Sequence, residues 1–392
     1  MALVQRTYTK ISSFITRINI RSYSKSVAER DIKKSVFISQ SKDIYTNLAL
    51  EDWMYHNLDF KDQHILMLWQ NDPCVVIGRH QNPWLEANFM ELPNITEQGV
   101  KLARRNSGGG TVFHDQGNLN LTFFTPREHY NRKYNLEIIT RSLFREFGLK
   151  VDISSREDLT VRDYKVSGTA SKLGRPNAYH HCTLLVNANK VDLSLALQKP
   201  EVDIQTNATK SIKSKIINLC EENPDISVTK LIKAVGWEYM RTPALSLMDG
   251  GMELANQQKG FQLVNPTNLW FPGLDEIRDQ YVSWDWCFGK TPKFNISKSF
   301  AVPESLVDSF GAPGNVKVTM TVEHGRINDV TLFVPPSLYS SGFAGEADVV
   351  TSLIGQKFSE EALDGLEGLL SSLVNDKDRF VTECLKQVMT SV

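Results

Sequence analysis

The sequence combines short apolar runs with longer stretches of helical periodicity, which is the pattern of a mixed α/β protein. Apolar and β-branched runs bounded by turn residues predict strands. The first two runs are separated by Gln70 and the turn residues Asn71, Asp72 and Pro73, so we expect them to form a buried β-hairpin. The strands predicted in this way are residues 65–69, 74–78, 119–124, 159–161 and 182–186.

Helical spacing is clearest after the third of these strands. Leu136, Ile139 and Leu143 recur about one turn apart, and Gly148 is placed to end that helix in a left-handed conformation. Residues 212–219 and 228–235 are two further predicted helices. Strands and helices mixed in this order favour an α/β layer built on a mixed sheet.

The pattern dissolves between residues 248 and 272, where Gly, Asn, Gln and Pro predict a linker between domains. Beyond it, alternating apolar residues at 316–322 and 330–334 predict a hairpin with one buried face. A helix capped by Ser359 and a last helix around Cys384 complete what we expect to be a small α+β domain.

The first thirty residues differ from the rest. No acidic residue precedes Glu29, and Arg6, Arg17 and Arg21 share one helical face while apolar residues occupy another. An amphipathic, Arg- and Ser-rich leader of this kind is typical of a mitochondrial transit peptide, the alternative being a disordered basic tail. The length of 392 residues suits about two further domains. We expect a transit peptide at 1–30, a larger domain at 31–265, a smaller domain at 266–392, and a location in the mitochondrial matrix.

Composition narrows the function classes. The chain is 41% apolar and 23% charged with a net charge of −1, which gives no support for a broad nucleic-acid surface. No apolar run approaches the ~20 residues that span a bilayer. The five cysteines form no Cys-x-x-Cys pair, so we expect neither a disulfide framework nor a structural zinc site.

The most informative segment begins at Arg104-Arg105 and passes through Ser107 into three glycines, Gly108 to Gly110. Glycine has no Cβ, so a ligand can lie directly against the backbone there. The strand-like residues 111–113 follow immediately, which places the glycines at the mouth of a strand. The arginines can offer a planar fork to a carboxylate or phosphate. The alternative is a flexible turn beside a solvated basic pair.

A second informative segment runs from Tyr164 to Ala170, where Lys165 precedes Ser167-Gly168. A lysine on a short strand, beside a residue that lets a ligand approach, can hold a carbonyl or phosphate oxygen as a point charge. For this lysine alone, a solvated hairpin residue is the alternative.

Together these segments resemble the lipoate–protein ligase A family, and within it the mitochondrial lipoyltransferases. The likeness covers nearly everything after the leader. It implies a biotin-ligase-like α/β catalytic domain with a mixed sheet, followed by a small α+β domain. It also implies an acyltransferase that moves a lipoyl group onto the ε-amine of a lysine in a lipoyl domain. The segments that carry the likeness are Ile77 to Trp84, Arg105 to Asn118, Arg156 to Leu159, Lys165 to Ala170, His180 to Leu185 and Trp284 to Phe294.

The same resemblance assigns roles to particular residues. Lys165 would be the catalytic residue, whose charge stabilises the developing oxyanion and the leaving phosphate. The glycine loop would close over the eight-carbon acyl chain, with Phe113 packed beside it. Neither a metal nor a permanently bound cofactor is implied, since the lipoyl group is a substrate. The residues implied to bind lipoyl-AMP are Arg105, Ser107, Gly108, Gly109, Gly110, Phe113, Arg156, Thr183, Ala208 and Thr209.

Two departures from the ligase pattern bear on the acyl donor. Ala208 stands where ATP-using ligases carry a glycine, and Glu157 stands where they carry an asparagine. An added Cβ limits how a loop can fold around phosphates. We therefore expect a monomeric transferase that takes lipoate from lipoyl-AMP or from lipoylated glycine cleavage H-protein and delivers it to lipoyl domains of the 2-oxoacid dehydrogenase complexes. An ATP-dependent lipoate–protein ligase and a non-catalytic lipoate-binding protein are the alternatives.

Other side chains allow further interpretations. The pair His180-His181 suggests a metal, but neighbours on a strand face opposite ways and no ligand cluster accompanies them. Cys182 could carry lipoate as a thioester, yet its apolar surroundings favour a buried, inert thiol. For His114 and Asp115 we expect a role in bracing the glycine loop rather than an acid/base pair.

Overall fold

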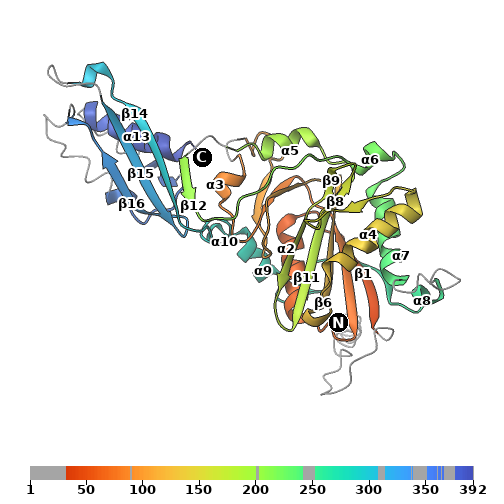
Figure 1. Ribbon diagram of the computed structural model, residues 1–392. Coiled ribbons are helices and arrows are strands. Elements are labelled where there is room, and N and C mark those ends of the chain that lie inside the picture. Colours follow the sequence, from red (N-terminus) through yellow and green to blue (C-terminus); the bar gives the residue numbers. More distant parts are fainter. Residues whose placement is uncertain are drawn as a thin grey trace.

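The computed structural model shows a larger and a smaller body lying side by side (Figure 1). It describes residues 32–88, 91–199, 203–241, 252–307, 314–336, 338, 351–359, 361–362, 364–365 and 376–391. The predicted leader and most of the helix predicted from Ser359 lie outside these residues. No helix in the described part of the chain is long and apolar enough to cross a membrane.

The larger body is built on a six-stranded sheet with the order β10-β11-β6-β2-β1-β13. Strands β13, β1 and β2 pair in parallel, while β2, β6, β11 and β10 pair antiparallel in turn. The mixed sheet predicted from the sequence is therefore confirmed. The strands are β1 Lys33–Ser39, β2 Gln63–Trp69, β6 Asn118–Pro126, β10 Thr169–Leu173, β11 Asn177–Leu185 and β13 Gly260–Val264.

Helices cover both faces of this sheet (Figure 1). Helices α4 and α7 pack on one face, and α2 packs on the other with α9 against it. Gly148 ends α4 with a φ of 66°, which confirms the predicted cap. The helices here are α2 Ile44–Asn57, α3 Pro83–Glu86, η2 Arg127–His129, α4 Arg132–Phe147, α5 Lys190–Ala196, α6 Leu219–Glu222, α7 Val228–Arg241, α8 Met252–Asn256, α9 Leu274–Val282 and α10 Trp284–Cys287.

Two small sheets complete the larger body. One has the order β4-β3-β5 and the other β7-β8-β9. The hairpin predicted at 65–78 is wrong, because β2 pairs with β1 and β6 whereas β3 pairs with β4 and β5. Most residues of both strands are buried, so the apolar runs do not tell which partner each strand takes. The strands are β3 Cys74–Ile77, β4 Lys101–Arg104, β5 Val112–His114, β7 Asp152–Ile153, β8 Leu159–Val161 and β9 Tyr164–Ser167.

The sequence pattern misleads at two further places. Residues 260–264, predicted to lie in a linker, form β13 at the edge of the large sheet. Residues 212–218 are not helical, and α6 begins only at Leu219. Ile216 instead forms a parallel bridge with Lys165. The bridge holds this loop against the strand that carries the predicted catalytic lysine.

The smaller body contains an antiparallel sheet with the order β12-β14-β15-β16, against which α13 packs. The hairpin predicted from the alternating apolar residues is β15-β16, and the last predicted helix is α13, so both are confirmed. The elements are β12 Asp203–Thr206, β14 Phe294–Ala301, η4 Glu304–Leu306, β15 Asn315–Glu323, β16 Arg326–Phe333 and α13 Asp376–Met389.

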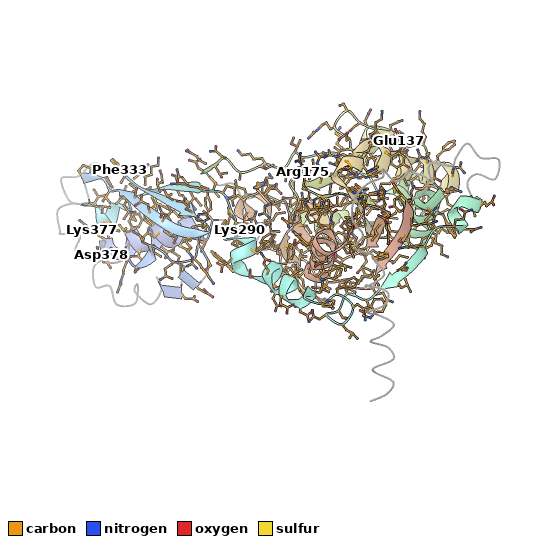
Figure 2. The ribbon with its side chains drawn as sticks, turned by 90° about the horizontal axis from the view of Figure 1, so that it is seen from below. Glu137, Arg175, Lys290, Phe333, Lys377 and Asp378 are labelled. Atoms are coloured by element: carbon orange, nitrogen blue, oxygen red, sulfur yellow. The ribbon has the colours of Figure 1, made fainter. Side chains whose placement is uncertain are left out.

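The smaller body includes residues that precede position 265 in the chain. Strand β12 pairs with β14 across about ninety positions of sequence. Trp84 of α3 lies in the core of the smaller body, with its ring centroid 5.3 Å from those of Phe294 and Phe358. Figure 2 shows Lys290 at the junction and Phe333 at the far end of the smaller body. The division at residue 265 stays a prediction.

A fully buried arginine fastens the junction. The Arg104 guanidinium donates hydrogen bonds to four backbone carbonyl oxygens, including that of Cys287 at 2.8 Å, and to Thr291 Oγ1 at 2.9 Å. The indole Nε1 of Trp286 donates in turn to the Arg104 carbonyl at 2.8 Å. Burial lowers the pKa of Arg104 to about 10, which leaves it charged at neutral pH. Arg104 is thus committed to the junction and is not available to an anion.

Candidate active site

A cavity of about 340 Å³ opens between the large sheet and the sheet β4-β3-β5. Strands β6 and β11 form its floor, and three loops border it: the glycine loop, residues 156–158 and residues 209–214. The cavity brings together seven of the residues predicted from the sequence, which are Arg105, Gly109, Gly110, Arg156, Lys165, Thr183 and Thr209.

One end of the cavity is apolar. Leu48, Trp69, Val76 and Val112 line it and belong to a single hydrophobic cluster on the α2 side of the large sheet. Burying a methylene group contributes about 0.8 kcal/mol, so this end suits an aliphatic chain.

Another part of the cavity is cationic. Arg132, Arg156, Lys165 and Lys210 line it, together with one carboxylate from Asp158. Such a concentration of positive charge attracts a phosphate or a carboxylate. An apolar end and a cationic part in one cavity suit an amphiphilic acyl phosphate.

Lys165 is held by the β8-β9 hairpin. Its Nζ lies 2.9 Å from Asp158 Oδ1, and its side chain is 27% exposed. The hairpin turn consists of Arg162 and Asp163, both with positive φ, as a tight two-residue turn requires. A register shift between β8 and β9 lies directly after Lys165, and such irregularities often redirect side chains next to active sites.

The glycine loop is shaped by Arg105. The guanidinium is buried and donates to the carbonyl oxygens of Gly108 and Gly110, both at 2.7 Å, and to Val76 O at 3.0 Å. Gly109 has a φ of 91°, and a Cβ there would lie 3.0 Å from Arg105 Nη2. Arg105 therefore turns the loop carbonyls inward. The sequence suggested that Arg105 binds an anion; the structure shows its guanidinium bonded to Ser107 and to three backbone carbonyl oxygens in the lining of the cavity.

Ser107 joins Arg105 to a buried chain of polar groups. Its Oγ accepts from Arg105 Nε at 3.0 Å and lies 2.8 Å from His181 Nε2. On the other side of the ring, His181 Nδ1 lies 2.9 Å from Glu51 Oε1. Burial would raise the pKa of Glu51, but the interaction with His181 and three hydrogen bonds outweigh it and lower that pKa. The chain is charge-compensated, with Glu51 negative at one end and Arg105 positive at the other.

The loop expected to hold the nucleotide, residues 207–211, is held by hydrogen bonds to α3 and to His80, which precedes that helix. Thr209 N donates to His80 O at 3.0 Å, and Ser211 N donates to Glu86 Oε1 at 3.1 Å. Ser211 Oγ accepts from Thr111 N at 2.8 Å, which ties this loop to the glycine loop. Ala208 is buried beside the cavity without lining it.

Some predicted residues lie elsewhere. Phe113 points into the cluster around β3 and α5 on the opposite side of β5, and the neighbouring Val112 lines the cavity in its place. Ser107 and Gly108 do not line the cavity; both accept hydrogen bonds from the Arg105 guanidinium and so hold the glycine loop. Cys182 is among the residues that line the cavity, but its side chain packs with the α4–α7 core, and burial raises the pKa of its thiol, as expected for an inert cysteine.

His180 and His181 face opposite ways, as the strand spacing predicts. His180 stacks on Phe123 at a centroid distance of 5.9 Å, on the face covered by α4, whereas His181 lines the cavity. Among the described residues, no group of three potential metal ligands is found.

His181 and Asn120 also line the cavity but were not predicted from the sequence. His181 shares one face of β11 with the predicted Thr183 at alternate positions, and Asn120 lies opposite Thr183 on β6. This period-two alternation is the signal that could have found them. Arg132 has no such signal, because it reaches the cavity from the first turn of a helix.

Comparisons with known proteins agree with this geometry. Residues 43–239 match the family model described as the lipoyl protein ligase A/B catalytic domain. The human protein named mitochondrial lipoyl amidotransferase LIPT1 is 38% identical over 373 residues, covering 92% of this chain and 94% of the human one. The mouse protein of the same name is 41% identical over 323 residues, covering 82% and 81%. The crystal structure of Plasmodium falciparum LipL1 in complex with lipoate superposes with a TM-score of 0.55 at 26% identity, covering 91% of this chain and 99% of that one.

Proposed function

Because the chain belongs to the family of the lipoyl protein ligase A/B catalytic domain, we propose that it is a mitochondrial lipoyl amidotransferase. It transfers a lipoyl group to the ε-amine of a lysine. The observation that carries this proposal is the single cavity with an apolar end, a cationic part and Lys165. The family expected from the sequence motifs is confirmed by the match of residues 43–239.

The cavity supports one orientation of the substrate. The eight-carbon chain lies against Leu48, Trp69 and Val112, and the activated carboxyl group lies near Lys165. Each buried methylene contributes about 0.8 kcal/mol of binding free energy. The phosphate of lipoyl-AMP lies among the cations, near Arg156 and Thr209. We propose these as the residues that bind the nucleotide end.

The reaction is an acyl transfer without a covalent enzyme intermediate. The neutral ε-amine of the acceptor lysine attacks the acyl carbonyl carbon, a C–N bond forms, and the C–O bond to phosphate breaks with AMP as the leaving group. The surplus amine proton passes to solvent. Lys165 stabilises the oxyanion and the leaving phosphate, and it does so most strongly in a site shielded from water.

The glycine loop provides a second source of positive potential. Arg105 draws the carbonyl oxygens of Gly108 and Gly110 toward itself. Within the described chain, the amide N–H groups of residues 108–110 have no hydrogen-bond acceptor. Free backbone donors beside an apolar slot suit a developing oxyanion.

The donor is the finer part of the proposal. Ala208 in place of a loop glycine favours lipoate that is already activated, as lipoyl-AMP or as lipoylated H-protein. The acceptors are lipoyl domains of the 2-oxoacid dehydrogenase complexes, and the protein acts as a monomer with no permanent cofactor. An ATP-dependent ligase with a tolerated loop change is the second candidate, and no geometric observation favours it.

The test is a lipoylation assay of an apo lipoyl domain with three donors: lipoate plus ATP, lipoyl-AMP, and lipoylated H-protein. We expect product, measured by mass spectrometry, from an activated or protein-bound donor but little from lipoate plus ATP. Product from all three would favour the ligase. Tight binding of lipoyl-AMP without any product would favour a lipoate-binding protein and contradict the proposal.

A further inference from the structure

Two buried hydrogen-bond donors stand unpaired in the lining of the cavity. His114 is 3% exposed and Asn120 is 2% exposed, and both line the cavity together with Trp69. Among the described residues, neither His114 Nε2 nor Asn120 Nδ2 has a hydrogen-bond partner. A buried donor without an acceptor destabilises a folded protein, so two of them in one binding cavity require an explanation.

A chain of hydrogen bonds fixes the tautomer of His114. Asn47 Nδ2 donates to the backbone carbonyls of Ser41 and Gln70, which can only accept, so the orientation of this amide is determined. The same Nδ2 donates to Asn71 Oδ1 at 2.9 Å. Asn71 Nδ2 therefore donates to His114 Nδ1, also at 2.9 Å. His114 Nδ1 is an acceptor, and the ring proton resides on Nε2.

The ring of His114 is also neutral. Burial, with the neighbouring Arg105 and His181 acting in the same direction, lowers the pKa of His114 to about 3. A ligand in the cavity would therefore meet a neutral N–H donor at His114. Trp69 supports it, with its ring centroid 6.1 Å from that of His114 and nearly perpendicular to it.

Asn120 Oδ1 accepts from Asn118 Nδ2 at 3.0 Å in this structure, which leaves Asn120 Nδ2 as a donor. On the large sheet Asn120 lies opposite Trp69 on β2 and opposite Thr183 on β11. Thr183 Oγ1 in turn accepts from Gly168 N at 3.0 Å, three positions after Lys165. Two strand spacings, about 10 Å, therefore separate Asn120 from the neighbourhood of Lys165, a span comparable with an extended eight-carbon chain.

The far end of the acyl chain must therefore meet donors that a plain hydrocarbon cannot satisfy. A fatty-acyl chain of the same length would bury both N–H groups without an acceptor. The two sulfur atoms of a dithiolane ring carry lone pairs that accept hydrogen bonds, although weakly. Sulfur also packs favourably against an aromatic ring such as that of Trp69.

Resting on the proposed function, we propose that His114 Nε2–H and the Asn120 side-chain amide donate hydrogen bonds to the sulfur atoms of the acyl group. These two residues thereby select a dithiolane-bearing chain over a plain eight-carbon fatty-acyl chain. They act as specificity-determining residues, remote from the bond that forms and breaks.

The test compares two substitutions of His114 that separate its two ring nitrogens. In His114→Asn, the side-chain oxygen keeps the acceptor toward Asn71 while the donor at the Nε2 position is lost. In His114→Gln, the side-chain amide keeps a donor near Nε2 while the acceptor toward Asn71 is lost. The measured quantity is the ratio of kcat/KM for lipoyl-AMP over octanoyl-AMP, with the ratio of calorimetric affinities as a second readout.

We expect the full-length wild-type protein to prefer lipoyl-AMP by about tenfold, the size of one or two net hydrogen bonds. His114→Asn should bring the ratio near one, whereas His114→Gln should keep most of it despite a lower Tm. A cavity left by either change affects both acyl chains, so the ratio cancels it. A role limited to bracing Asn71 gives the opposite ranking.

A wild-type ratio near one, or a ratio preserved in His114→Asn, would overturn the inference. If neither His114 variant folds, Asn120→Leu tests the second donor, and an unchanged ratio there counts against the proposal as well. The failure of the proposed function looks different, because the wild-type protein then transfers neither acyl group while the affinity ratio still reports on selectivity.

Discussion

Lys165 Nζ and Asp158 Oδ1 lie 2.9 Å apart in the wall of one cavity. The backbone of Lys165 is fixed as well, since its N–H donates to Lys215 O and its carbonyl accepts from Ile217 N. A Cβ at Gly168 would lie 3.9 Å from the ammonium. The positive charge is therefore held in place before a substrate arrives, which is the condition for electrostatic stabilisation of a transition state.

Lys165→Ala should lower the rate of transfer from lipoyl-AMP by about 10²–10³-fold, because one group that stabilises the oxyanion is lost. The Tm should change little, since the ion pair is partly exposed. Lys190→Ala is the matched control: it removes an exposed lysine of α5 that pairs with Glu221 of α6, and it should leave the rate unchanged. Near-normal transfer by Lys165→Ala would remove the residue from its proposed role.

Gly109→Val should abolish measurable binding of lipoyl-AMP in calorimetry. Its Cβ would lie 3.0 Å from Arg105 Nη2 and 3.4 Å from Ala170 Cβ, and a φ of 91° disfavours any L side chain. Gly148→Val controls for the backbone, with a φ of 66° and nothing within 4 Å of its Cβ. It pays a similar penalty of about 1–3 kcal/mol far from the cavity. Equal affinities in the two variants would sink the assignment of the glycine loop.

The purified protein should release little pyrophosphate from ATP in the presence of free lipoate, while it transfers readily from lipoyl-AMP. The reason is the Cβ of Ala208 in the loop expected to wrap the phosphates. Ala208→Gly tests the same reason from the other side, and a gain in pyrophosphate release would support it. Rapid lipoate-dependent release by the unchanged protein would restore the ligase.

Acid should destabilise the protein partly through His180. Burial lowers its pKa well below the ordinary value of 6.5, with Arg132 and His181 acting in the same direction. A histidine whose pKa is lowered in the folded state stays neutral there, whereas in the unfolded chain it takes up a proton below about pH 6.5. Stability is therefore lost as pH falls, by up to about 1.4 kcal/mol per pH unit for each such group.

The substitution that isolates this contribution is His180→Phe, since the ring already stacks on Phe123. Urea unfolding between pH 7 and pH 5 should show a shallower loss of stability in the variant. Parallel slopes for the two proteins would mean that His180 titrates alike in both states.

A fusion of residues 1–35 to a fluorescent protein should enter mitochondria, because basic residues on one face and apolar residues on another suit an import receptor. Replacement of Arg6, Arg17 and Arg21 by Glu should leave the fusion in the cytosol. A wild-type leader that stays cytosolic would count against its assignment as a transit peptide.

The sequence predicts those parts of the fold in which one face is buried. Strands β15 and β16 alternate clearly, and Gly148 marks the end of α4 by its backbone freedom. Strands β2 and β3 were predicted as strands, but their pairing escapes prediction because they are mostly buried. A continuous apolar run does not identify its neighbour.

The candidate site was likewise predictable only in part. Lys165 and the glycine loop were identified by their resemblance to a family, which carries spatial information that composition lacks. The partners of Arg105 and His114 were not, since the chain from Asn47 through Asn71 joins residues far apart in sequence. Hydrogen-bond geometry adds support of the glycine loop as a role of Arg105, while its role in binding lipoyl-AMP stays a prediction.

Strand β12 and Trp84 give the smaller body an unusual dependence. Its sheet includes β12 and its core includes Trp84, and both precede residue 265 in the chain. A truncation after residue 265 would leave β12 as an unpaired strand edge and the indole of Trp84 without its aromatic partners. Both are features that promote aggregation. Premature stop codons that fall between residue 265 and β14 should therefore yield insoluble protein rather than a shortened enzyme.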